Sequence, residues 1–236
     1  MTSYIYNGKS KQYAAPVRRK NKKAPLFSNM AFILCGSHPV EGFKVNGSNL
    51  LFEYEDSEIL EYQLDIIHSV CEDPEIIVIS GVSHADFVKH DRRNEFILIE
   101  NQLYEFSNSA EDLKIGMHAI RSPHAIFIDN GFIPTLDTFK YLANSKDRVS
   151  KVFVKPTPDK NYVGANIGSG GIINNFTFST NNTITGMFYI TTNDIDRLRK
   201  KSITKKFLKN KFAFEILSDL KLKAVVDESK SIIVVR

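Results

Sequence analysis

The run Met30-Ala-Phe-Ile-Leu-Cys35 is wholly apolar and ends at Gly36-Ser37, as expected for a buried strand that opens into a loop. Apolar residues at helical spacing follow from Ile59 to Val70, and Ser57 is the predicted helix cap. The run Glu75-Ile-Ile-Val-Ile-Ser-Gly81 then repeats the strand pattern and its glycine stop. The order strand, helix, strand predicts a parallel pair of strands with a crossover helix.

The same alternation continues through the next sixty residues. The patterns predict a short helix from Ala85, a strand over 95–100, a helix over 109–120, a strand over 124–129 and a helix over 136–142. We therefore expect an α/β fold: a Rossmann-like, mostly parallel mixed sheet with helices on both faces. Ligands of such sheets bind at the carboxyl ends of the strands, so the loops at Gly36, Gly81, Asn101 and Asp129 should converge.

The pattern changes after Ser150, where short strands without long helices predict antiparallel additions at one edge of the sheet. Helices are predicted over 192–200 and 207–220, and a closing strand over 231–235. The sequence has no internal repeat. We expect one domain over 30–236, preceded by a separate segment over 1–29.

That first segment is strongly basic. Residues 1–30 contain seven lysines and arginines and no acid. Because the whole chain has a net charge of +4, the remaining residues have a net charge of −3. The densest part holds Arg18, Arg19, Lys20, Lys22 and Lys23. Such an arm could bind phosphates of a nucleic acid, or an acidic protein surface, through counterion release. The alternative is a solvated leader that aids solubility.

Composition narrows the class of protein further. The chain has 236 residues, of which 42% are hydrophobic and 25% charged, which fits a globular domain. Cys35 and Cys71 cannot form a disulfide framework and are expected to be free thiols in a reducing compartment. No apolar run approaches the roughly 20 residues of a membrane span, and no signal-peptide pattern opens the sequence. We expect a cytoplasmic protein without a membrane partner.

Five segments resemble a known family in order and spacing. They are Ile33-Leu-Cys-Gly36-Ser37, then Ser48-Asn-Leu50-Leu51 before the first helix, then Glu75 to Gly81, then Asn101-Gln-Leu-Tyr104-Glu-Phe-Ser107-Asn108-Ser-Ala-Glu-Asp112-Leu113, and Ala125-Ile-Phe-Ile-Asp129-Asn130-Gly131. Together with Gly186-Met-Phe-Tyr-Ile, they are similar to the sugar-phosphate nucleotidyltransferases and, more closely, the bacterial choline-phosphate cytidylyltransferase type. The likeness runs from about Ala31 to Arg236.

The resemblance implies a reaction and a set of site residues. Such enzymes let a substrate phosphate attack the α-phosphate of a nucleoside triphosphate and expel pyrophosphate, with Mg²⁺ held by carboxylates. It places Gly36, Ser37, Gly81, Asn101, Tyr104, Ser107 and Asn108 around the nucleotide. Asp129 would hold the metal. Lys44 is the one nearby substitute for the family's phosphate-binding lysine, either as a displaced phosphate ligand or as a solvated loop lysine.

The chain departs from the family where charge matters most. Ser48 stands at the lysine's place, Gly131 at that of the metal aspartate and Asp112 at that of a serine, while Pro39 removes an amide donor from the phosphate loop. Asp129 could equally cap a turn made by Asn130 and Gly131. These departures predict a catalytically degenerate binding or structural module, and the alternative is an active nucleotidyltransferase.

Two further patterns have structural alternatives. Basic residues recur from Arg197 to Lys211, either as a solvated face near a helix end or as a second phosphate contact. Asp194-Ile-Asp196 matches the metal motif of a glycosyltransferase, but acids at the start of a predicted helix also suit the helix dipole.

Overall fold

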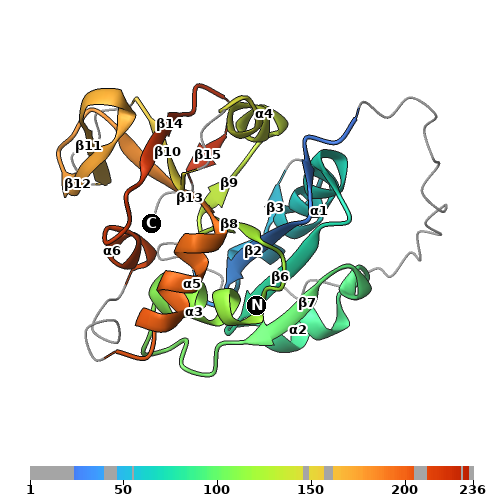
Figure 1. Ribbon diagram of the computed structural model, residues 1–236. Helices are drawn as coiled ribbons and strands as arrows, with labels where there is room; N and C mark the ends of the chain where they lie inside the picture. Colours follow the sequence, from blue (N-terminus) through green and yellow to red (C-terminus); the bar gives the residue numbers. More distant parts are fainter. Residues whose placement is uncertain are drawn as a thin grey trace, which may run out of the picture.

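The computed structural model describes residues 24–39, 47–54, 56–145, 149–156, 162–204, 212–229 and 231–233. Within these residues, nine strands form one mixed sheet in the order β12-β11-β13-β8-β2-β6-β7, with β10 paired to β13 and β14 paired to β10. Figure 1 shows the β11–β12 hairpin at one end of this sheet and β7 near the other. The expected α/β fold with a central parallel region is confirmed.

The parallel region contains the strands that the apolar runs predict. Its members are β2 (Met30–Gly36), β6 (Glu75–Ser80), β7 (Ile97–Glu100) and β8 (His124–Ile128). Every residue of β2 is buried, because the strand lies between β6 and β8 and helices cover both faces. Ile33 pairs with Ile77 on one side and with Phe127 on the other. This register brings the carboxyl ends of the parallel strands to one edge.

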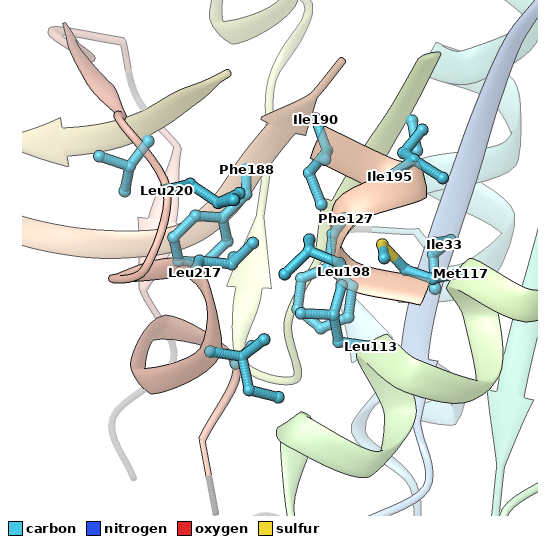
Figure 2. Close-up of a cluster of buried hydrophobic side chains, with 14 of the residues drawn as sticks. Ile33, Leu113, Met117, Phe127, Phe188, Ile190, Ile195, Leu198, Leu217 and Leu220 are labelled. Atoms are coloured by element: carbon cyan, nitrogen blue, oxygen red, sulfur yellow. The ribbon is translucent and has the colours of Figure 1, made fainter. Parts of the chain in front are cut away.

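Helices bury apolar side chains against both faces of the sheet. One face is covered by α3 (Ser109–Ala119), α5 (Thr192–Lys201) and α6 (Ala213–Leu217), and the other by α1 (Ile59–Val70) and α4 (Leu136–Asn144). Figure 2 shows Leu113 and Met117 of α3 and Leu198 of α5 packed together near Phe127 of β8. All four side chains are at most 2% exposed. This burial of apolar surface is the main stabilising contribution to the α3–α5 face.

The second half of the chain extends the sheet. Strands β10 (Lys151–Lys155), β11 (Val163–Ile167), β12 (Ile173–Phe178) and β13 (Thr183–Ile190) form antiparallel pairs, and β13 joins them to β8. The predicted antiparallel additions are therefore confirmed. The sequence did not reveal β14 (Lys223–Val226), which runs parallel to β10.

Short elements complete the described chain. Strand pairs lie outside the main sheet: β1 (Phe27–Ser28) with β5 (Cys71–Glu72), β3 (Glu53–Tyr54) with β4 (Ser57–Glu58), and β9 (Phe132–Ile133) with β15 (Ile232–Ile233). The remaining helices are α2 (His84–Lys89) and the short 3-10 helices η1 (Asn49–Leu51), η2 (Arg93–Glu95) and η3 (Ser169–Gly171). No helix of the described ranges is long and apolar enough to cross a membrane.

Two predicted boundaries are wrong. Ser57 does not cap α1, because it pairs with Tyr54 in the β3–β4 hairpin, and Glu58 takes the cap position without a side-chain hydrogen bond. The helix predicted over 207–220 is limited, in its described part, to Ala213–Leu217. The rest of its start lies in 205–211, outside the described residues.

Candidate functional site

The predicted loops converge at the carboxyl ends of the parallel strands. The Val82 amide donates to the Ser37 carbonyl at 2.9 Å, and the Asn101 amide donates to the Ser80 carbonyl at 2.6 Å. Asn130, just beyond β8, donates its side-chain amide to the His38 carbonyl at 2.8 Å. The ends of β2, β6, β7 and β8 are thereby joined into one site.

Gly36 and Gly81 are required by close approach of the chain. A β-carbon at Gly81 would lie 2.5 Å from Cβ of Tyr104 and 2.6 Å from the Ser37 carbonyl oxygen. One at Gly36 would lie 2.7 Å from Leu50 and 2.8 Å from Ser48 Oγ. Both glycines therefore let neighbouring segments pack directly on the strand ends.

Asp112 lies at the centre of the site, in the first turn of α3, and its side chain is fully buried. Its Oδ2 accepts the Ser37 hydroxyl at 2.5 Å, and its Oδ1 accepts the Asn101 amide at 2.9 Å. A buried carboxylate is costly unless it is paired in this way. The start of the α3 dipole also favours its negative charge.

His38 adds a titratable imidazole to this cluster. Its Nδ1 lies 2.6 Å from Ser37 Oγ and 3.6 Å from Asp112 Oδ2, and its Nε2 lies 2.9 Å from the Ser107 carbonyl oxygen. Burial opposes a charged imidazole, but the hydrogen bond and negative charge of Asp112, the Ser107 carbonyl and the charge of Asp129 outweigh it. The pKa of His38 is therefore raised above its ordinary value.

The segment 101–107 closes on itself above the strand ends. The side-chain oxygen of Asn101 accepts a hydrogen bond from the Leu103 amide at 3.0 Å. The side-chain nitrogen of Asn101 donates one to Ser107 Oγ at 3.0 Å. The Ser107 amide also donates to the Leu103 carbonyl at 2.9 Å. Asn101 and Ser107 thus use their polar atoms to hold the loop.

The other two residues predicted from this stretch have different environments. Asn108 caps α3, because its Oδ1 accepts the Ser109 amide at 2.8 Å. Tyr104 lies over Gly81 with its hydroxyl directed to solvent and to Glu105, 3.3 Å away. The negative charge of Glu105 raises the pKa of the Tyr104 phenol. Tyr104 is half-buried, whereas Asn101 is buried.

Asp129 forms the turn that the sequence allowed as an alternative to metal binding. Its Oδ1 accepts the Asn130 amide at 2.8 Å, its carbonyl accepts the Phe132 amide at 3.3 Å, and Gly131 has a φ of 94°. The described ranges contain no group of three or more His, Cys, Asp or Glu side chains that could hold a metal. Among the described residues Asp129 therefore has a structural role in this turn, and metal binding by Asp129 stays a prediction of the resemblance.

Some predicted residues lie outside the described residues. These are Lys44 of the phosphate loop and Arg18, Arg19, Lys20, Lys22 and Lys23 of the arm. Ser48, which stands in the place of the family's lysine, is fully buried and forms a β-bridge with Pro39.

Each of the other two patterns has a described member with a structural role. Arg199 donates from Nε to the Met117 carbonyl at 2.7 Å and from Nη2 to the Ile120 carbonyl at 2.6 Å, so it caps the end of α3. Asp194 accepts the Ser150 hydroxyl at 2.5 Å in the first turn of α5. These contacts favour the helix-end interpretations over phosphate binding and over a glycosyltransferase metal motif.

Sequence reasoning missed the pairing of His38 with Asp112. The sequence does single out Asp112, because it stands where the family has a serine. Its partner could not be found because the two residues are distant in sequence and His38 has no metal-ligand spacing to neighbouring histidines.

Comparison with known proteins now identifies the class of fold. The site lies at the carboxyl ends of parallel strands in a Rossmann-like mixed sheet, as in nucleotide-binding α/β proteins. No protein-family model and no curated protein sequence matches the chain. Solved structures do match, and they give the chain a nucleotidyltransferase-like fold.

Three of these structures illustrate the likeness. The CTP:phosphocholine cytidylyltransferase of Streptococcus pneumoniae (LicC) has a TM-score of 0.70 and 13% identity, over 88% of this chain and 93% of that one. The inositol-1-phosphate CTP transferase of T. maritima has a TM-score of 0.63 and 12% identity, over 87% of both chains. A UDP-glucose pyrophosphorylase complexed with UDP-glucose has a TM-score of 0.61 and 11% identity, over 86% of this chain and 91% of that one.

Proposed function

We propose that this protein is a catalytically degenerate nucleotidyltransferase-like module that acts by binding or assembly rather than by phosphate transfer. The buried carboxylate of Asp112 supports this proposal most directly. It accepts hydrogen bonds from the Ser37 hydroxyl and from the Asn101 side-chain amide. The family resemblance assigns both of these residues to the nucleotide. A nucleotide would have to displace these internal hydrogen bonds before it could form its own.

Charge supports the same conclusion. The charged groups that act on His38 in the described site are the carboxylates of Asp112 and Asp129. A triphosphate entering this site would be repelled by the carboxylate of Asp129, whereas the carboxylate of Asp112 is paired with His38.

The buried free thiols of Cys35 and Cys71 suit the reducing cytoplasm, where we expect the protein to act.

The test is the thermal unfolding midpoint of the full chain with millimolar CTP, UTP, ATP or GTP and Mg²⁺. A ligand at about 100 times its dissociation constant would add roughly 2.7 kcal/mol of stability. We expect no rise in the midpoint with any of the four. A rise specific to one nucleotide would contradict the loss of the nucleotide site.

A second experiment addresses the arm as the contact to nucleic acid or to an acidic protein surface. Fluorescence anisotropy with a single-stranded DNA of about 20 nucleotides would be measured over a salt series. The test variant changes Arg18, Arg19, Lys20, Lys22 and Lys23 to Gln. Its matched control changes Lys89, Lys114, Arg121, Lys140 and Lys221, which lie outside both basic segments, to Gln.

Each phosphate contact contributes about 0.7 to the slope of log affinity against log salt for a single strand. In the arm variant the slope of log affinity against log salt should become shallower by up to about 3.5. The control, which has the same net charge, should keep the slope of the unaltered protein. Equal losses in both variants would show that net charge, and not the arm, attracts the DNA.

One observation favours the second candidate, an active nucleotidyltransferase with a nucleoside triphosphate and a sugar-phosphate or choline-phosphate-type substrate. Gly36, Ser37, Gly81 and Asn101 do converge at one edge, and Tyr104 stands accessible above Gly81. Pyrophosphate release from a nucleotide in the presence of Mg²⁺ and a candidate sugar phosphate would establish this activity. We expect none above a sample without protein.

A further inference from the structure

The hydrogen bonds of His38 fix the number of protons in the buried cluster. The Ser107 carbonyl can only accept, so His38 Nε2, 2.9 Å away, carries a proton. An ionised Asp112 also only accepts, so the single hydroxyl hydrogen of Ser37 is donated to it in the hydrogen bond of 2.5 Å. Ser37 Oγ then offers lone pairs alone to His38 Nδ1 at 2.6 Å, and this nitrogen must carry a proton too.

The alternative placement of protons gives the same count. If Asp112 is protonated, it donates to Ser37, and Ser37 donates to a neutral His38. Either way the cluster holds one proton more than an ionised carboxyl and a neutral imidazole hold together. Without that proton, one of the three contacts joins two acceptors with no hydrogen between them.

We propose that Ser37, His38 and Asp112 form a proton-dependent clasp that fastens the segment 101–107 to the end of β2. His38 holds the far end of the segment through the Ser107 carbonyl, and Asp112 holds its near end through Asn101. Loss of one proton to solvent breaks a contact of the clasp and loosens the segment. The accessible face of the site is therefore controlled by pH.

The groups around the imidazole favour the bound proton. In the described part of the site, Asp112 faces it from α3, the charge of Asp129 acts on it from the end of β8, and the neutral Ser37 and Ser107 form hydrogen bonds with it. Both charges are negative, and they raise the pKa of His38 in spite of its burial. This mechanism goes beyond the proposed function and holds whether or not the arm binds a partner.

Amide hydrogen exchange of the full chain tests the clasp. Protection would be followed from about pH 5.5 to 8.5, corrected for intrinsic exchange, at the Leu103 and Ser107 amides, which are bonded within the segment. Protection should fall as pH rises. The fall should reach up to tenfold for each pH unit between the titration midpoint of the cluster in the open clasp and its midpoint in the closed clasp. Protection that stays constant over this range would overturn the proposal.

A matched pair of variants separates the clasp from other histidines. His38→Gln should make the protection of these amides independent of pH, whereas His118→Gln, which changes an exposed histidine on α3, should leave the pH dependence intact. An unchanged pH dependence in His38→Gln would contradict the proposal.

Titration of the unaltered protein gives a readout that needs no variant. The imidazole ¹⁵N shifts of His38 would be followed over the same pH range. The imidazole should titrate above the midpoint of a free histidine side chain, because the cluster retains its proton. A midpoint at or below the ordinary value would overturn the clasp even if His38→Gln fails to fold.

Discussion

Two histidine–carboxylate pairs in this protein differ mainly in the exposure of the carboxylate. His38 pairs with Asp112, whose side chain is fully buried, whereas His90 pairs with Glu58, whose side chain is 41% exposed. Both carboxylates raise the pKa of their histidine. Water can replace Glu58 as a partner but cannot reach Asp112, so the same type of pair should contribute very differently to the free energy of unfolding.

The largest expected effect is that of Asp112→Ala. The change leaves Ser37 and Asn101 without their buried acceptor and His38 without its carboxylate partner, and breaking a buried pair typically costs about 3–5 kcal/mol. Urea unfolding at neutral pH measures the loss. Asp65→Ala is the matched control, because the Asp65 side chain is 75% exposed beside Arg92 and its loss should cost less than about 1 kcal/mol. Equal losses would remove the distinction between the buried and exposed pairs.

Gly81→Ala should have the next largest effect. Its β-carbon would meet the Ser37 carbonyl, which is backbone and cannot rotate away, so we expect a loss of about 1–3 kcal/mol from overpacking. Gly47→Ala is the control, since a β-carbon there has its nearest neighbour at 3.5 Å. If both variants unfold at the same urea concentration, the strand ends are less tightly packed than the distances indicate.

Glu58→Gln should have the smallest effect, and it should depend on pH. The hydrogen bond and charge of Glu58 raise the pKa of His90, so the pair stabilises the protein below the ordinary histidine pKa and loses this contribution as pH rises through the folded value. The exposure of Glu58 limits the effect to less than about 1 kcal/mol. Thermal midpoints of the two proteins should therefore differ at about pH 5.5 and approach each other by about pH 8.5. A difference that grows with pH would have the wrong sign for this pair.

The sequence predicted the parallel half of the fold better than the rest. Runs such as Met30 to Cys35 are apolar throughout, and a central strand buried on both faces requires this pattern. Strand β14 was missed because Lys223-Ala-Val-Val226 is short, and its partner β10 lies about seventy residues earlier. Local patterns carry no information about such a pairing.

The same limit applies to the site. Convergence of the loops at Gly36, Gly81 and Asn101 follows from parallel topology, so it could be predicted. The partner of each side chain could not, because Ser37 and Asp112 are 75 residues apart and meet only after α3 packs on the sheet. The position of the Tyr104 hydroxyl beside Glu105 and the turn-forming contacts of Asp129 likewise depend on the folded structure.

The late position of β14 in the chain has a consequence during synthesis. Strand β10 emerges from the ribosome about seventy residues before β14, and until then the edge that β14 covers stays open. This edge includes Val152, Phe153 and Val154, three apolar residues that are fully buried in the finished protein. An uncovered apolar strand is a site for wrong pairing with other chains. The nascent chain therefore leaves this edge open to aggregation until Lys223 to Val226 are made.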